Sequence, residues 1–104
     1  MVSYSIFSQA FRFARGCEME SEYVQACTDA GLEAEKDILK RIYAIAKMSW
    51  RERREKILGI SRAEMHRQYG IPLRTLEDWE AGKYKPADYI ETLLAYTLLQ
   101  PKNF

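Results

Sequence analysis

The segment from residue 73 to 78 contains side chains that can recognise the edges of DNA base pairs. Arg74 carries a planar guanidinium, which can donate two hydrogen bonds to O6 and N7 of a guanine. Leu73 offers an apolar contact to a thymine methyl, and Asp78 can accept a hydrogen bond from N4 of cytosine or orient Arg74. If this segment is the start of a helix that enters the major groove, the candidate base-reading residues are Leu73, Arg74 and, one turn later, Asp78.

Helix start and stop signals surround these residues within 22 positions. Ser61 opens an S-x-x-E capping box, which predicts the start of a first helix, and Gly70 predicts its end. Pro72 suits the first position of a second helix, because its missing N–H is not needed there, and Gly82 is the next stop. The spacing therefore predicts a helix-turn-helix whose second helix runs from Pro72 to Ala81.

Apolar residues at helical spacing are expected to hold these two helices together. Met65 and Tyr69 lie four positions apart on one face of the first helix, and Leu76 and Trp79 of the second helix point back toward them. We therefore assign these four residues to the core. His66 is interpreted as structural, since no carboxylate or cysteine stands beside it at the spacing of a metal site.

The chain resembles the helix-turn-helix of the lambdoid phage repressor and xenobiotic-response-element-like regulator family in the pattern S-x-x-E-x-x-x-x-x-G-I-x-x-x-T-L-x-x-W-E-x-G. The resemblance runs from about Ser49 to Leu99, and the version Y-G-I-P-x-R-T-L-E-D-W-E-A-G looks like small single-domain regulators of bacterial and mobile-element genomes. It implies binding to double-stranded DNA, with base contacts at Leu73, Arg74 and Asp78. It also implies contacts to the DNA backbone, which position a protein without reading sequence, near Arg62, Thr75, Lys83, Tyr84 and Lys85.

Two positions of the motif depart from the family pattern. His66 stands where the family usually has a small residue, so either the two helices cross more loosely or the imidazole is turned aside. The family often pairs an arginine of the preceding helix with the glutamate of W-E-x-G. In this chain Glu55 holds that register and Arg54 lies one place earlier, which leaves an ion pair between Arg54 and Glu80 open. We expect Glu80 to tie its helix to an earlier one rather than to touch DNA, whose phosphates would repel it.

The net charge is only +1, from 16 Lys and Arg against 15 Asp and Glu, which is a weak electrostatic footprint for a DNA-binding protein. After Met48 there are 10 basic and 8 acidic residues. Glu77 and Asp78 place two carboxylates on the predicted reading helix, where DNA phosphates would repel them. Positive charge must therefore come from local placement. There are two candidate clusters. The first consists of Arg51, Arg53, Arg54 and Lys56, and it either contacts phosphates or is only a solvated face. The second consists of Lys83 and Lys85.

Little else in the composition points to chemistry. Cys17 and Cys27 are ten positions apart with no C-x-x-C, and the chain has one histidine, so we expect no metal, no cofactor and no enzyme activity. Cys27 is interpreted as a buried free thiol, although the sequence leaves an internal disulfide open, and a reducing cytoplasm fits a DNA-binding chain. We expect no signal peptide and no membrane-spanning segment.

Start and stop signals outside the motif predict further helices, so we expect an all-α fold, a compact helical bundle with an N-terminal helical extension. The predicted helices are one ending at Gly16, one ending at Gly31, one from Leu32 to Met48, one opened by the S-x-x-E box at Ser49 and ended by Gly59, and one from Pro86 to Pro101. The last helix is predicted to carry its apolar side on Ile90, Leu93, Leu94, Thr97 and Leu98.

We divide the chain into an N-terminal helical extension, residues 1–48, and a helix-turn-helix domain, residues 49–104, which together form one compact unit. The extension is more apolar than the short motif domain needs, at Ile6, Phe7, Phe11, Phe13, Ile38, Ile42 and Ile45. A homodimer interface accounts for this excess and would place two reading helices about 34 Å apart on a palindromic operator. The alternative is that these helices pack on one another and on the C-terminal domain.

These observations predict a sequence-specific transcriptional regulator, a repressor or antitoxin-like autoregulator, that occupies an operator in double-stranded DNA without catalysis. The alternative is a protein-interaction module or inhibitor, with a partner such as a toxin, that keeps the helix-turn-helix scaffold without specific DNA binding. Salt dependence distinguishes the two hypotheses, because affinity that depends on phosphate contacts falls linearly with the logarithm of the salt concentration.

Overall fold

The computed structural model describes residues 2–100, and in this range the chain has the all-α architecture that the sequence predicts, with no strands. The molecule measures 40 × 28 × 20 Å. No helix within these residues combines the length and the apolar character needed to cross a bilayer. The elements are α1 (Tyr4–Gly16), α2 (Glu20–Asp29), α3 (Lys36–Lys47), α4 (Trp50–Glu52), a π-helix η1 (Arg53–Leu58) that continues α4, α5 (Arg62–Tyr69), α6 (Leu73–Glu80) and α7 (Asp88–Leu98).

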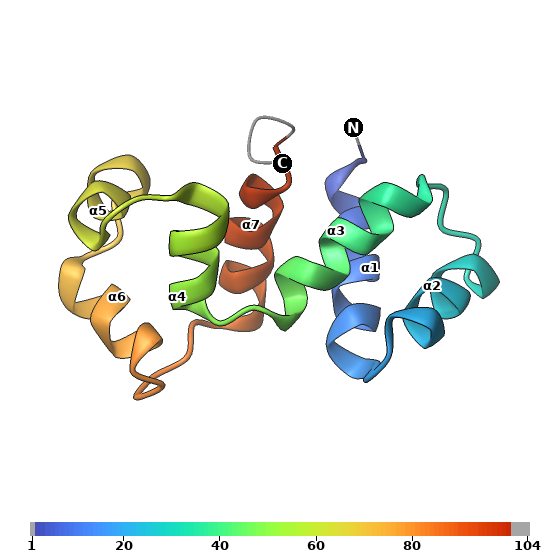
Figure 1. Ribbon diagram of the computed structural model, residues 1–104, viewed down its shortest axis with the longest axis horizontal. Helices are drawn as coiled ribbons and strands as arrows, with labels where there is room; N and C mark the ends of the chain where they lie inside the picture. The colour runs from blue at the N-terminus through green and yellow to red at the C-terminus, as the bar shows by residue number, and fades with distance from the viewer. Residues whose placement is uncertain (1, 101–104) are drawn as a thin grey trace.

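Figure 1 shows two lobes that share one helix. The first lobe consists of α1, α2 and α3, the second of α4, η1, α5 and α6, and α7 lies between them. The shared helix serves both sides: Leu94 packs against the small core of the second lobe, whereas Ala95 and Leu98 are buried in the larger core of the first. The two predicted segments of the chain are therefore joined through a helix that comes from the second segment.

Side chains of α1 and α3 fill the larger core. Phe7 and Phe11 lie one turn apart on α1, are at most 1% exposed, and stack with ring centroids 5.4 Å apart. Ile42 and Ile45 of α3 are fully buried in the same core. Four of the seven apolar residues that suggested a dimer interface are thus buried within the chain, as the internal-packing alternative requires, and the other three are partly buried against the same core: Ile6, Phe13 and Ile38. The homodimer remains a prediction, but these buried side chains no longer support it.

The third helix begins four residues later than predicted, at Lys36 rather than Leu32. Gly31 adopts a left-handed conformation with φ +72°, and the amide of Leu32 donates a hydrogen bond to the carbonyl of Cys27 at 3.0 Å. Leu32 therefore closes the end of α2 instead of starting α3, because its N–H is already bonded to a carbonyl of the earlier helix.

α7 turns inward only part of the side that the spacing predicts: Leu98 is buried and Leu94 is half-buried against the small core. Leu93 is 49% exposed, whereas Ala95 is fully buried and the hydroxyl of Tyr96 donates to the carbonyl of Val2 at 2.7 Å. The predicted apolar side is therefore confirmed at Leu98 and wrong at Leu93 and Thr97, which are exposed. Apolar residues occur on nearly every side of this helix, so tertiary packing decides which of them are buried. The predicted stop at Pro101 lies outside the described residues.

Two tyrosines of the first lobe differ in whether their hydroxyl groups are satisfied. The ring centroids of Tyr23 and Tyr43 are 5.2 Å apart. The Tyr43 hydroxyl donates to the carbonyl of Glu18 at 2.8 Å, whereas the Tyr23 hydroxyl is buried without a hydrogen-bond partner among residues 2–100. Burial raises the pKa of Tyr23 above its usual value, because the phenolate is disfavoured away from water.

We expect Tyr23→Phe to leave the free energy of unfolding unchanged or to raise it by up to about 1 kcal/mol, because the hydroxyl that is removed has no partner. The matched change Tyr43→Phe should lower the free energy of unfolding by about 1 kcal/mol, because it removes a hydrogen bond. Urea unfolding followed by circular dichroism measures both values. An equal loss in the two variants would contradict this account of Tyr23.

Candidate nucleic-acid interface

Local signals set the boundaries of α5 and α6 much as the sequence predicts. The Ser61 hydroxyl accepts a hydrogen bond from the amide of Glu64 at 3.1 Å, and Gly70 ends α5 with φ +72°. Only this half of the predicted capping box forms, since the Glu64 carboxylate faces Arg67 and Gln68 instead. Pro72 is the N-cap rather than the first helical residue, so α6 begins at the next residue and is one residue shorter at each end than predicted.

A small apolar core holds α6 against α5. Met65 and Leu76 are each 1% exposed, as predicted, and Ile71 of the turn is buried with them. Tyr69 and Trp79 are half-buried and pack against this core, and the Trp79 ring lies 4.9 Å from that of Trp50, between centroids. The four predicted core residues are therefore in the core, two of them at its edge.

His66 is turned aside from the contact between the two helices. Its Nδ1 lies 2.6 Å from the carbonyl oxygen of Ile71, in the turn between α5 and α6. A carbonyl oxygen only accepts hydrogen bonds, so Nδ1 carries the hydrogen in this contact. The structure therefore supports the alternative in which the imidazole is turned aside: it lies away from the contact between the helices and donates a hydrogen bond to the carbonyl of Ile71.

Two of the three candidate base-reading residues, Leu73 and Arg74, are exposed in the first turn of α6, and the third, Asp78, is half-buried. Leu73 is 42% exposed, and the side chain of Arg74 is 77% exposed. The Nε of Arg74 is 3.6 Å from a carboxylate oxygen of Asp78, whose side chain is 19% exposed. This arrangement corresponds to the second of the two roles considered for Asp78, in which its carboxylate orients the guanidinium of Arg74.

The candidate backbone-contacting residues fall into two groups. Arg62 and Thr75 are partly engaged within the protein: the Arg62 Nε donates to Glu80 at 3.3 Å, and Thr75 is half-buried. The loop after α6 is exposed, and its Lys83 and Lys85 form no ion pair within residues 2–100. Lys83 places its Nζ 5.7 Å from the centre of the Tyr84 ring. The loop therefore offers the freest positive charge near α6.

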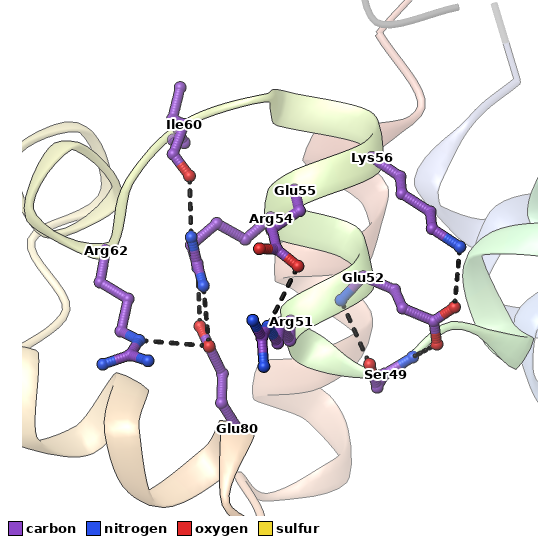
Figure 2. Close-up of polar contacts among 9 residues, drawn as sticks. All are labelled: Ser49, Arg51, Glu52, Arg54, Glu55, Lys56, Ile60, Arg62 and Glu80. Atoms are coloured by element: carbon purple, nitrogen blue, oxygen red, sulfur yellow. Dashed lines mark hydrogen bonds and ion pairs between the residues drawn. The ribbon is translucent and has the colours of Figure 1, made fainter.

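A buried ion pair fastens the C-terminal end of α6 to η1 (Figure 2). The Nε and Nη2 atoms of Arg54 donate to the two carboxylate oxygens of Glu80 at 2.8 and 2.9 Å, and Nη1 donates to the carbonyl of Ile60 at 3.0 Å. The side chains of Arg54 and Glu80 are 9% and 6% exposed. The pair that the sequence left open is therefore formed, and Glu80 ties its helix to an earlier one as expected.

The π-helix explains why Arg54 reaches Glu80 although it lies one residue before Glu55, the position at which the sequence pattern places the arginine. In η1 the amide of Gly59 bonds to the carbonyl of Arg54, five residues back, so one more residue is fitted into the turn than an α-helix allows. This extra residue offsets the difference in register. The complete capping box of Ser49 and Glu52 still starts the segment, with bonds of 3.0 and 3.1 Å (Figure 2).

The first arginine cluster is neither a phosphate-binding group nor a solvated face as a whole. Arg53 and Arg54 are 2% and 7% exposed, and Arg53 donates to the carbonyl of Ile45 and to Glu91 at 3.0 and 2.9 Å. Burial lowers the pKa of Arg53, and Glu91 opposes this effect. The exposed members Arg51 and Lys56 form ion pairs one turn along the helix. Both expectations were therefore wrong for Arg53 and Arg54, which are internal, whereas the exposed Arg51 and Lys56 fit the solvated face.

The hydrogen bonds from Arg54 lower the pKa of Glu80 below its usual value, since they stabilise the carboxylate. A glutamate that titrates near pH 4.3 when unfolded and lower when folded stabilises the fold above that pH, and this contribution is lost as the pH falls through the folded pKa. We therefore expect the urea midpoint of the wild type to fall more steeply between pH 6 and pH 3 than that of Glu80→Gln. Parallel curves would contradict this role for Glu80.

Comparison of the chain with protein-family models, curated proteins and solved structures finds no match in any of the three. The family resemblance of residues 49–99, and the roles that it implies for individual side chains, therefore stay predictions.

Proposed function

We propose that this chain is a sequence-specific DNA-binding regulator, a repressor or autoregulator, that places the first turn of α6 in the major groove and acts without catalysis. The observation that carries the proposal is the exposure of Leu73 and Arg74 at the start of a helix whose opposite side is fixed. The buried side of α6 packs through Leu76 against Met65 of α5, and the ion pair of Glu80 with Arg54 fixes its C-terminal end. A rigidly held helix supports recognition, because base contacts require side chains in defined positions.

Phosphate contacts are assigned to the loop that follows α6. Lys83 and Lys85 are exposed and unpaired within the described chain, and Gly82 lets the loop turn sharply with φ +73°. Because cations near phosphates release counterions from the duplex, these lysines contribute affinity without reading sequence. A homodimer on a palindromic operator remains part of the proposal, since one eight-residue helix reads few base pairs by itself.

One observation favours a second candidate function, a protein-binding module. Two exposed arginines at α6 both face carboxylates, Arg62 at Glu80 and Arg74 at Asp78, and Glu77 of the same helix is exposed. Paired charges of this kind attract phosphates less than free ones, and they suit a partner protein such as a toxin. The two functions predict different salt dependence.

Selection from a random duplex library tests the proposed function. We expect enrichment of one sequence, whose affinity falls with salt at a logarithmic slope of about −0.9 per phosphate contact. Lys83→Gln and Lys85→Gln should each reduce this slope by about 0.9, whereas Lys40→Gln, on the exposed side of α3, should leave it unchanged. If no duplex is enriched, or if binding is insensitive to salt, the protein-binding function is favoured.

Glu77→Gln is expected to raise the affinity for duplexes of any sequence about two- to fivefold at low salt. The carboxylate is exposed on α6 and repels phosphates, and an exposed charge contributes about 0–1 kcal/mol. Fluorescence anisotropy with a scrambled duplex measures the change, and added salt should reduce it. Glu22→Gln on α2 removes the same charge from the other lobe and serves as control. A gain of equal size in both variants would assign the effect to net charge alone.

A further inference from the structure

A cleft of about 450 Å³ opens where the loop after α6 passes α4, and residues of α1 and α7 complete its lining. It therefore touches both lobes and the reading helix at once. Its volume is in the range of small-molecule sites, which are about 300–1,000 Å³. Of its lining residues, the DNA-binding proposal assigns a DNA contact to Lys85 alone.

Aromatic side chains form the wall of the cleft on the side of the second lobe. Trp50 and Trp79, the two tryptophans of the chain, are half-buried there with ring planes 36° apart. Tyr84 lines the same cleft from the loop and is 61% exposed. Because aromatic faces pack favourably on other flat rings, this wall suits a planar ligand.

The charged groups of the cleft leave one positive charge free. Glu80 and Glu91 line it, but each carboxylate already faces two arginines within 4 Å. Arg15 also lines it and is held by Asp88 at 3.1 Å. Lys85 is the one charged lining residue without an ion-pair partner within residues 2–100. An anion entering the cleft therefore finds an unpaired cation and no unpaired carboxylate.

We propose that this cleft binds a planar aromatic anion, with an aromatic carboxylate as the simplest example. The ring of the ligand packs on the aromatic wall, and its carboxylate pairs with Lys85. The ring supplies apolar contact and the lysine supplies charge selection, so both parts of the ligand are needed.

This site gives the ligand a regulatory effect, an inference that rests on the proposed function. Lys85 cannot hold the ligand carboxylate and an operator phosphate at the same time. Ligand and DNA therefore weaken each other's binding by the same factor, as linkage requires. The salt slope of DNA binding should fall by about 0.9 when the ligand is present, because one phosphate contact is lost.

Binding itself is tested without DNA, by titrating the ¹⁵N-labelled chain with benzoate, benzamide or acetate at constant ionic strength. The two indole N–H signals report on the cleft directly, because both tryptophans line it. We expect benzoate to shift them saturably with a dissociation constant in the millimolar range, as suits so small a ligand. Benzamide, which lacks the charge, should bind at least about fivefold more weakly, and acetate, which lacks the ring, should leave the signals in place.

Lys85→Gln distinguishes recognition of the anion from non-specific binding of the aromatic ring. Lys85 is exposed, and its replacement should lower the affinity for benzoate at least about fivefold while leaving the affinity for benzamide unchanged. Lys40→Gln should change neither affinity. Equal binding of benzoate and benzamide, or equal losses for both in Lys85→Gln, overturns the proposal. So does the absence of any shift up to 50 mM, a limit about tenfold above the expected range. If DNA selection fails while benzoate still binds as expected, only the regulatory step falls.

Discussion

Replacement of Arg54 by methionine is expected to lower the free energy of unfolding by about 3–5 kcal/mol. Methionine keeps an aliphatic side chain but leaves the Glu80 carboxylate, which is 6% exposed, with only the longer contact to Arg62 at 3.3 Å. Removing one partner of a buried ion pair is costly, because the remaining charge has lost its water as well as its counterion. The change also frees the carbonyl of Ile60, a backbone acceptor in the connection to α5.

Two further variants give this prediction its controls. Arg51→Met removes an arginine that is 65% exposed and paired one turn away, so it should cost about 0–1 kcal/mol. The double variant Arg54→Met, Glu80→Leu should recover at least half of the loss, because no buried charge is left unpaired. Urea unfolding measures all three variants. Equal losses in Arg54→Met and Arg51→Met, or no recovery in the double variant, would show that the pair contributes little.

The boundaries of the helices from Trp50 to Glu80 were largely predictable because the interactions that set them are local. The Ser49 and Ser61 hydroxyls each bond an amide three residues ahead, and Gly59 and Gly70 each end a helix with positive φ. Residue types at fixed short spacings specify such contacts, so the sequence is sufficient to find them. The candidate base-reading residues were found in the same way, since the start of α6 fixes which residues occupy its first turn.

What the sequence could not predict depends on partners far along the chain. Arg53 and Arg54 look like members of a surface cluster, and the carboxylates that compensate their buried charge, Glu91 and Glu80, lie 38 and 26 residues later. No residue type in the fourth helix predicts a π-helix, so the register that brings Arg54 to Glu80 was not readable. The aromatic cleft was missed for the same reason, because its lining comes from four separate stretches of the chain.

Arg74→Ala is expected to weaken binding to the selected duplex by about 1–3 kcal/mol, or about 5- to 150-fold, if the guanidinium reads a guanine. The side chain is 77% exposed at the start of α6 and packs on no core, so its removal should leave the free energy of unfolding within about 0.5 kcal/mol of the wild type. Fluorescence anisotropy with the selected and a scrambled duplex measures the effect. The loss should be much smaller on the scrambled duplex, because that duplex lacks the specific base contact.

Arg74→Lys and Asp78→Asn separate the shape of the guanidinium from its charge. Lysine keeps the positive charge but loses the planar fork that bonds O6 and N7 together, so most of the loss in specific affinity should remain. Asp78→Asn removes the carboxylate that lies 3.6 Å from Arg74. If that carboxylate orients the guanidinium, this variant should lose discrimination between duplexes while gaining affinity for both, since a repulsive charge is gone. Equal weakening of both duplexes by Arg74→Ala would instead make Arg74 a phosphate contact, and base reading would then fall to other residues of α6.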